Sequence, residues 1–168
     1  MWYYDFPVAP GSYWIGACVD AVSEETSTTN NCSSGVQVTV SWPPDLIVES
    51  PGVSDTSLTP GQSFTASATV RNQGSGSSSA TTLRYYLSTN STISTSDPQI
   101  GVDSVGALAA GGTSLESELV SAPITQGTYW RGACVDSVSE ESSTTNNCSS
   151  GVEVTVSVAP DLVVESPG

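Results

Sequence analysis

Side chains that could bind a metal ion gather in one acidic segment, VDSVSEESSTTNNC, at residues 135–148. Calcium prefers carboxylate and amide oxygens, and a loop whose ends are joined loses less entropy when several of them assemble around an ion. The candidate ligands are Asp136, Glu140, Glu141, Asn146 and Asn147. Their spacing matches no EF-hand, so a solvated loop whose asparagines form Asx-turns is the alternative to a calcium site.

The four cysteines form two pairs with the same spacing, Cys18 with Cys32 and Cys134 with Cys148. A zinc site needs four ligands at close spacing, whereas each of these segments offers two cysteines and the chain has no histidine. The pattern therefore predicts one local disulfide in each segment. Disulfides persist in oxidising compartments, which favours an extracellular or cell-surface location.

The residues needed for catalysis are scarce. The chain has no histidine and no lysine, so its many serines have no general base of the usual kind, and no Gly-x-Ser-x-Gly motif occurs. The adjacent Glu140 and Glu141 would point to opposite sides of an extended chain, which does not suit the carboxylate pair of a glycosidase. We predict that the chain is not an enzyme and needs no cofactor, calcium being the one candidate.

The charge balance is strongly acidic. Seventeen acidic residues face three basic ones, Arg71, Arg84 and Arg131, and the formal net charge is -14. Nucleic acids and anionic membrane surfaces are therefore excluded as partners, because both require clustered Lys and Arg. No apolar run is long enough to insert into a membrane, and the start MWYYDFPVAPG lacks the features of a signal peptide. We expect residues outside this chain to direct secretion.

An internal repeat organises the chain. Residues 13–52 match residues 129–168 at a shift of 116 positions, with 33 of 40 positions identical. The register predicts a complete repeat at 45–158, the C-terminal part of another at 1–42, and the first strand of a third at 160–168. Prolines in the joins SWPPDL and SVAPDL stiffen the linkers. We expect a tandem array in which neighbouring repeats are the partners.

Short alternating segments separated by Gly, Ser, Asn, Asp and Pro predict an all-β fold, an immunoglobulin-like antiparallel β-sandwich of about seven strands. In the expected strand 63–71, small or apolar residues recur at every second position, which places that face of the strand on a core. Arg131 breaks the alternation of its own segment, so we expect it at a strand edge, where its end reaches solvent. The expected strands are 45–50, 63–71, 81–88, 99–105, 114–122, 128–136 and 152–157.

Four local motifs resemble the CARDB family, the cell-adhesion-related domain found in bacteria. They are Asn-x-Gly at 72–74, Tyr-Tyr-Leu-Ser at 85–88, Gly-x-Tyr at 127–129, and an acidic loop at 136–147 that ends in Asn-Asn. The resemblance covers 45–158, and 11–42 a second time. It implies an immunoglobulin-like sandwich found in arrays on large secreted or surface proteins, with no catalytic activity of its own. The cysteine pair is an addition that many members lack.

The N-terminal residues MWYYDFPV place Trp2, Tyr4 and Phe6 on one face of an expected strand. In a complete sandwich this face would be core, but in a free half-domain it would be an exposed aromatic stripe beside open sheet edges. Such a half-domain could pair with the strand of a neighbour and grow a head-to-tail filament. The self-association candidates are Trp2, Tyr4, Phe6, Asp161, Leu162, Val163 and Val164.

The favoured function is a non-catalytic structural or adhesive repeat that acts as a spacer or stalk in a large extracellular or cell-surface protein. The first alternative is a subunit of an extracellular filament, assembled head-to-tail by strand complementation between chains. The second is an adhesion module that binds calcium or, through the exposed aromatics, a glycan.

Overall fold

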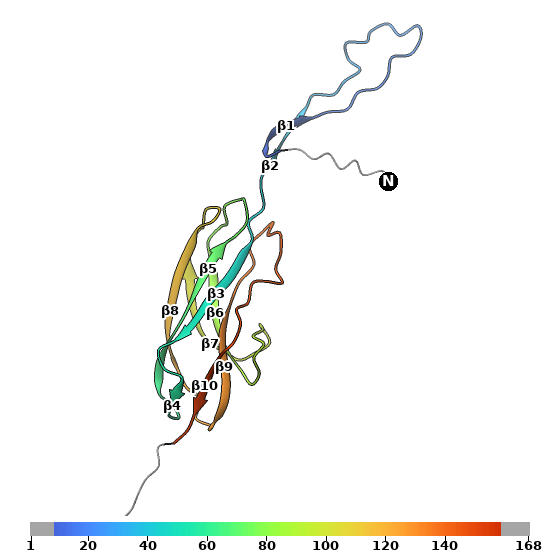
Figure 1. The fold of residues 1–168 in the computed structure, drawn as a ribbon. Helices are drawn as coiled ribbons and strands as arrows, with labels where there is room; N and C mark the ends of the chain where they lie inside the picture. Colours follow the sequence, from blue (N-terminus) through green and yellow to red (C-terminus); the bar gives the residue numbers. More distant parts are fainter. Residues whose placement is uncertain (1–8, 159–168) are drawn as a thin grey trace, which may run out of the picture. The chain divides into compact units, whose positions relative to one another are not determined.

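The computed structural model describes residues 9–158, and all regular structure within them is β-strand (Figure 1). The chain forms two compact units, Met1–Trp42 and Pro43–Gly168. The predicted self-association residues at 2–6 and 161–164 lie outside the described residues. The first unit contains β1 (Gly11–Ile15) and β2 (Val36–Val40). The second contains β3 (Leu46–Val53), β4 (Ser57–Leu58), β5 (Ser63–Asn72), β6 (Thr81–Ser88), β7 (Gln99–Val105), β8 (Thr113–Ser121), β9 (Gly127–Val135) and β10 (Val152–Val156).

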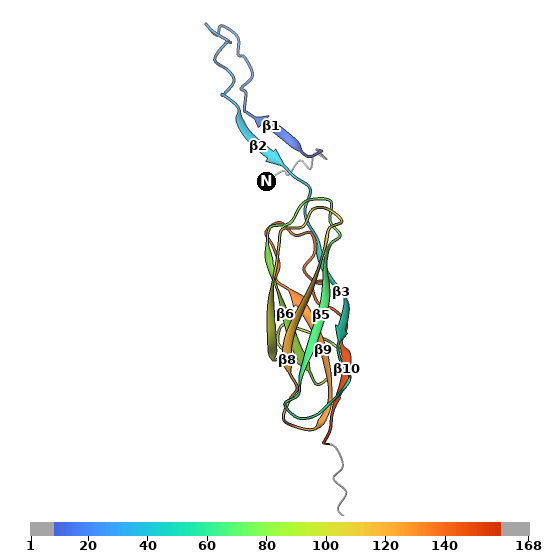
Figure 2. The same ribbon diagram turned by 90° about the vertical axis from the view of Figure 1, so that its left-hand side faces the viewer.

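The second unit is a sandwich of two sheets, which overlap one behind the other in Figure 2. One sheet has the order β4-β10-β9-β6-β7 and the other β3-β5-β8. The all-β, immunoglobulin-like prediction is confirmed, and all seven expected strands occur within three residues of their predicted ends. Strand β4 was not predicted, because its two residues are too few to show an alternating pattern. β4 pairs in parallel with β10, whereas the other strand pairs are antiparallel.

The core lies between the two sheets, and alternation along the strands fills it. The inner face of β5 consists of Phe64, Ala66, Ala68 and Val70, which are all at most 3% exposed. Leu83 and Tyr85 of β6 and Val154 and Val156 of β10 meet this face from the other sheet. Burial of each large apolar side chain contributes about 1.5–3 kcal/mol, so the predicted inner faces supply most of the driving force for folding.

Asn72, at the end of β5, joins three loops at one end of the sandwich. Its side chain is fully buried, and its Oδ1 accepts hydrogen bonds from the N–H groups of Asp45 and Gly74, each at 3.1 Å. Its Nδ2 donates to three carbonyl oxygens, those of Gly76, Leu108 and Ala109. The amide therefore satisfies backbone groups that have no partner in a β-ladder.

Gly74 completes this arrangement because the chain entering the sandwich passes directly over it. A Cβ atom at Gly74 would lie 2.5 Å from the nitrogen of Asp45 and 2.6 Å from the carbonyl carbon of Pro44. Such contacts are too close for any side chain, so the position requires glycine. The Asn-x-Gly motif therefore has a structural role, in which the amide bonds the entering chain and the glycine makes room for it.

The first unit is a hairpin whose geometry repeats that of β9 and β10. Tyr13 pairs with Val38 in the first hairpin and Tyr129 with Val154 in the second, so the two registers are the same at a shift of 116 residues. The Tyr13 hydroxyl donates to the Ala9 carbonyl at 2.6 Å, as the Tyr129 hydroxyl does to that of Thr125 at 3.1 Å. The duplication in sequence is thus also a duplication in structure.

Replacement of Asn72 by alanine should destabilise the sandwich by about 3–5 kcal/mol, because it leaves several buried backbone groups without partners. Denaturant unfolding of the full chain measures this loss. The matched control is Asn90→Ala, since exposed Asn90 accepts one hydrogen bond, from the Thr92 N–H at 2.9 Å. Its cost should stay within about 1 kcal/mol. Equal losses in the two variants would contradict the role assigned to Asn72.

Candidate functional site

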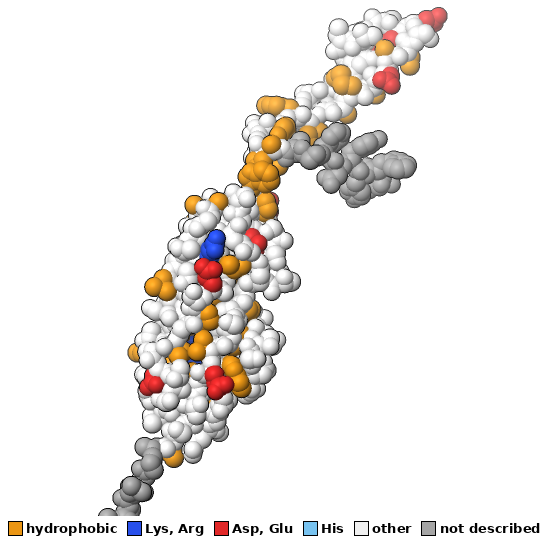
Figure 3. All heavy atoms as spheres, viewed as in Figure 1, with side chains coloured by type: hydrophobic (Ala, Val, Ile, Leu, Met, Phe, Trp, Pro, Cys, Tyr) orange, Lys and Arg blue, Asp and Glu red, His pale blue; other side chains and the backbone are white. Residues whose placement is uncertain are grey.

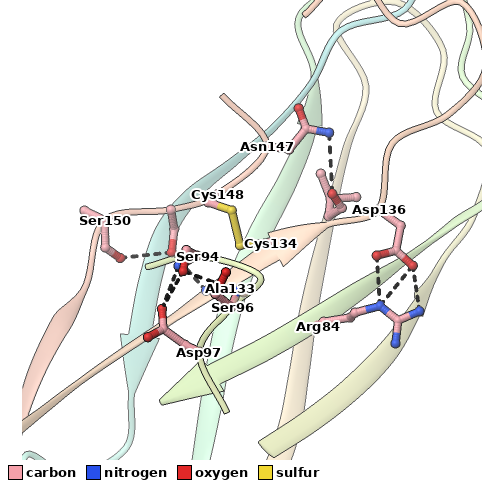
Figure 4. Close-up of a disulfide and its surroundings, with 12 residues drawn as sticks. Arg84, Ser94, Ser96, Asp97, Ala133, Cys134, Asp136, Asn147, Cys148 and Ser150 are labelled. Atoms are coloured by element: carbon pink, nitrogen blue, oxygen red, sulfur yellow. Dashed lines mark hydrogen bonds and ion pairs between the residues drawn. A yellow bond between two sulfur atoms is a disulfide. The ribbon is translucent and has the colours of Figure 1, made fainter. Parts of the chain in front are cut away.

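The acidic loop that follows β9 is closed by a disulfide between Cys134 and Cys148 (Figure 4). The two Cα atoms lie 4.0 Å apart, and Cys134 is 2% exposed. Cys18 and Cys32 form the corresponding disulfide in the first unit, so both predicted pairs are confirmed. Each bond closes a loop of about 15 residues, which the chain-entropy model values at about 3 kcal/mol.

Glu141 connects this loop to the first strand of the sandwich. Its Oε1 accepts a hydrogen bond from the Leu46 N–H at 2.7 Å, and its Oε2 accepts one from the Val138 N–H at 3.2 Å. The side-chain amide of Asn147 donates to both carboxylate oxygens at 3.3 Å and to the Val135 carbonyl at 3.4 Å. One carboxylate thus shapes the loop and attaches it to β3.

Asp136 has a different partner, the guanidinium of Arg84 on β6. The Nε of Arg84 donates to Oδ1 at 2.8 Å and its Nη2 donates to Oδ2 at 2.8 Å, as Figure 4 shows. These hydrogen bonds and the charge of Asp136 raise the pKa of Arg84. The forked pair ties the end of β9 to the neighbouring strand, so both Asp136 and Glu141 are occupied by protein donors.

The structure therefore spreads the predicted calcium ligands over different contacts. Glu140 is exposed and has a left-handed backbone with φ of 63°, while the amide of Asn146 donates to Asp45 at 3.0 Å. Within residues 9–158 no three acidic, cysteine or histidine side chains gather in a way that could hold a metal ion. Figure 3 likewise shows acidic side chains scattered over the sandwich face in view. The calcium site stays a prediction.

Two polar atoms in this loop nevertheless lack partners. The Oδ1 atoms of Asn146 and Asn147 are both buried, and neither accepts a hydrogen bond. Asn147 is 5% exposed. A buried acceptor without a donor is costly, and these are oxygens of the kind that calcium prefers.

An open hollow of about 400 Å³ lies beside the disulfide. Hydroxyl groups supply much of its lining, from Ser94, Thr95, Ser137, Thr144 and Thr145. No aromatic ring is among its lining residues, so the hollow does not provide the stacking surface by which proteins commonly hold a sugar.

Arg131 is buried, and the prediction that it lies at a strand edge was wrong. It is 2% exposed and stands in the middle of β9, between β10 and β6, where its guanidinium lies 4.9 Å from the ring centre of Phe64. Its Nε and Nη1 are buried without hydrogen-bond partners. Burial lowers the pKa of Arg131 to about 10. Among the described residues, ion pairs involve Arg71 and Arg84 but not Arg131.

The loop of the first unit keeps the same internal contacts, although the described residues of that unit form a sheet of two strands and no sandwich. Glu25 accepts hydrogen bonds from the Val22 N–H and the Asn31 amide, both at 3.2 Å, as Glu141 does from Val138 and Asn147. Glu24 has φ of 71°, close to the value of 63° at Glu140. The loop conformation is therefore local in origin, and attachment to the rest of a domain is a separate event.

A family model described as CARDB matches residues 43–151. The crystal structure of the CARDB domain of a Pyrococcus furiosus protein, in complex with di-metal ions, is 21% identical, with a TM-score of 0.51 over 68% of this chain and 89% of that one. A domain of a candidate cell-surface protein from Methanosarcina acetivorans is 20% identical, with a TM-score of 0.52 over 68% and 92%. At such identities the likeness concerns the fold. No curated protein matches the chain in sequence.

Replacement of Glu141 by alanine should lower the free energy of unfolding by about 1.5–3 kcal/mol, because the Leu46 N–H loses a charged acceptor. Denaturant unfolding of the full chain measures it. The duplicate provides a matched control, Glu25→Ala, since the contacts of Glu25 lie within its own loop. That variant should leave the sandwich transition unchanged. A similar loss in both variants would show that the carboxylate acts within the loop rather than on β3.

Proposed function

Because this chain belongs to the CARDB family, we propose that it is a non-catalytic spacer or stalk module of a large extracellular or cell-surface protein. In this proposal residues 45–158 are one complete repeat, 1–42 are the end of another, and 160–168 begin a third. Neighbouring repeats are then the main partners. The duplicated hairpin register and the two disulfides support a repeated, oxidised architecture. No helix among the described residues is long and apolar enough to cross a membrane.

The observation that carries the proposal is the path of the chain through the sandwich. At one end the Pro43 carbonyl accepts a hydrogen bond from the Gly76 N–H at 3.0 Å. At the other end Val156 of β10 pairs with Leu58 of β4, and β3 runs between the two ends (Figure 1). The chain therefore enters and leaves at opposite ends, as a module that transmits tension along a string would require.

At the exit end, β10 lies side by side with β4, the short strand that follows β3 in the chain, and the two run parallel. The Thr155 N–H donates to the Thr56 carbonyl at 2.8 Å, and the Ser157 N–H donates to the Leu58 carbonyl at 2.9 Å. Tension between the two ends loads this pair in shear, so its hydrogen bonds must break together rather than one after another. The resulting resistance supports a mechanical function.

The sandwich should unfold at a higher force when it is pulled through residues 43 and 158 than through residues 43 and 112. Gly112 lies at the same end as the entering chain, since its carbonyl accepts from the Asn72 N–H at 2.9 Å, so the second geometry peels strands apart one bond at a time. Single-molecule force spectroscopy on the full chain makes the comparison. Equal forces in the two geometries would contradict the mechanical proposal.

The same traces contain an internal check on the disulfide. Cys134 and Cys148 are 14 positions apart, and their bond keeps the enclosed loop from extending. Reduction should therefore lengthen the unfolded sandwich by roughly 45 Å, the span of those positions in extended chain.

We propose calcium binding at the acidic loop as a second function. The buried, unpartnered Oδ1 atoms of Asn146 and Asn147 favour it, and so does the net charge of -14. The Pyrococcus furiosus domain binds di-metal ions in its crystal structure. The bonds of Asp136 to Arg84 and of Glu141 to Leu46 count against it, because calcium would have to share those oxygens.

Calcium at ten times its dissociation constant should stabilise the full chain by about 1.4 kcal/mol and raise its Tm by roughly 5 °C. Magnesium should not substitute, since it requires a smaller octahedral shell. Asn146→Ala should remove the shift, whereas Asn30→Ala, the same change in the first unit, should retain it. If millimolar calcium does not change the Tm, the acidic loop is a purely structural element.

A further inference from the structure

The first hairpin exposes side chains that the second hairpin buries. Ala133, Cys134 and Val135 of β9 are all at most 3% exposed, whereas their counterparts in the first hairpin are exposed. The clearest case is Val19, which is 69% exposed where Val135 is 3% exposed. Within residues 9–158 the first hairpin thus presents the docking face of the second one with no strand covering it.

The groups that attach the second hairpin to the sandwich also recur in the first. Arg84 binds Asp136, whose counterpart is Asp20, and the Leu46 N–H binds Glu141, whose counterpart is Glu25. Gly132 recurs as Gly16; a Cβ atom at Gly132 would lie 2.6 Å from the side chain of Ile93. Residues 45–122 therefore form a receptor surface that matches either hairpin.

The hairpins, residues 11–40 and 127–156, differ at one fully buried position. There the second hairpin has Arg131, which is 2% exposed with two unpartnered donors, and the first has Ile15. The surroundings of Arg131 include the rings of Phe64 and Tyr85, which suit an aliphatic side chain. The remaining differences lie at exposed or partly exposed positions, such as Gln37 in place of Glu153.

We propose that hairpin β1–β2 of one copy replaces hairpin β9–β10 in the sandwich of a second copy. The foreign hairpin is preferred over the resident one because it places Ile15 where the resident hairpin buries Arg131. Repeated, the exchange joins copies head-to-tail, and an asymmetric contact of this kind yields rings where the rotation between copies closes and open chains where it does not. The occupant of the exposed face is therefore the receptor surface 45–122 of another copy. This inference names the partner segment and direction of the filament alternative and does not rest on the spacer role.

The exchange must occur between copies because the linker is too short to allow it within one. In the exchanged position Val40 would take the place of Val156, beside Leu58, while β3 begins at Leu46 at the other end of the sandwich. That separation is at least the length of β3, roughly 26 Å for eight residues. The five linking residues 41–45 span at most roughly 21 Å.

Two magnitudes set the concentration at which exchange is expected. Replacing a buried charge by a packed apolar side chain favours the foreign hairpin by roughly fivefold to several-hundred-fold. Against it, a short tether holds the resident hairpin at an effective concentration of roughly millimolar. The ratio places half-exchange between roughly 2 µM and 200 µM. Each disulfide closes its own hairpin, so an oxidised chain can exchange the hairpin as one unit.

The test is to unfold the oxidised full chain in denaturant, refold it at a series of concentrations up to about 1 mM, and measure oligomers by light scattering and electron microscopy. The wild type should form oligomers that increase with concentration. Ile15→Arg should raise the concentration of half-oligomerisation at least about fivefold, because its hairpin loses the advantage of an apolar side chain at the buried position. Ile15 is exposed and lies outside the sandwich, so this variant still folds.

Arg131→Ile separates exchange from simple surface adhesion. It gives the resident hairpin the same buried residue as its competitor, so oligomers should again need at least about fivefold more protein, although the exposed hairpin is unchanged. Gln37→Glu, which copies an exposed difference, should behave as the wild type. Wild-type chains that stay monomeric at 1 mM, or Arg131→Ile chains that oligomerise like the wild type, would overturn the proposal. A monomeric, mechanically resistant chain would leave the spacer proposal intact.

Discussion

The sandwich depends on the attachment of its last hairpin to its first strand. That hairpin supplies β9 and β10, which stand inside the five-stranded sheet, and without them β4 and β6 have no partner on those edges. Glu141 fixes one end of the hairpin to the Leu46 N–H, and the parallel pairing of β4 with β10 fixes the other. The chain thus closes its core by joining segments 95 positions apart in sequence. Enclosure of the core follows from this closure, and the proposed resistance to tension depends on it.

Comparison of the two hairpins shows which structural features the local sequence determines by itself. The same residues give the same strand register, the same disulfide and the same left-handed glutamate whether or not a sandwich lies beneath them. Burial is different, because Val19 stays exposed and Val135 becomes core. Folding of the hairpin and its docking are therefore separable, as the proposed exchange between copies requires.

Three basic residues in so acidic a chain have three different roles. Arg71 lies 3.9 Å from Glu49 at the surface, and Arg84 binds Asp136 with a forked geometry. Arg131 lies between the sheets over Phe64 with two donors unpaired. Solvent screens the exposed Arg71 pair, whereas the buried arginine cannot exchange its lost hydration for protein partners. The costliest of the three charges is therefore the one that distinguishes the two hairpins.

The sequence by itself determined the strands, their inner faces and the disulfides. Alternation along a strand determines which side chains are buried, and the spacing of the cysteines determines which thiols can pair, so both patterns are local. It also identified the Asn-x-Gly motif, but not its purpose, since the groups that Asn72 bonds belong to loops up to 37 positions away. Tertiary structure decided the parallel β4–β10 pair, the division of the acidic loop among Arg84, Leu46 and Asp45, and the burial of Arg131. In each case the deciding partner lies on another strand or loop. For Arg131, the sequence pattern of an arginine in an alternating strand is the same whether the side chain lies at the edge of the sheet or in the core. Position across the sheet, which the order of residues does not state, made the difference.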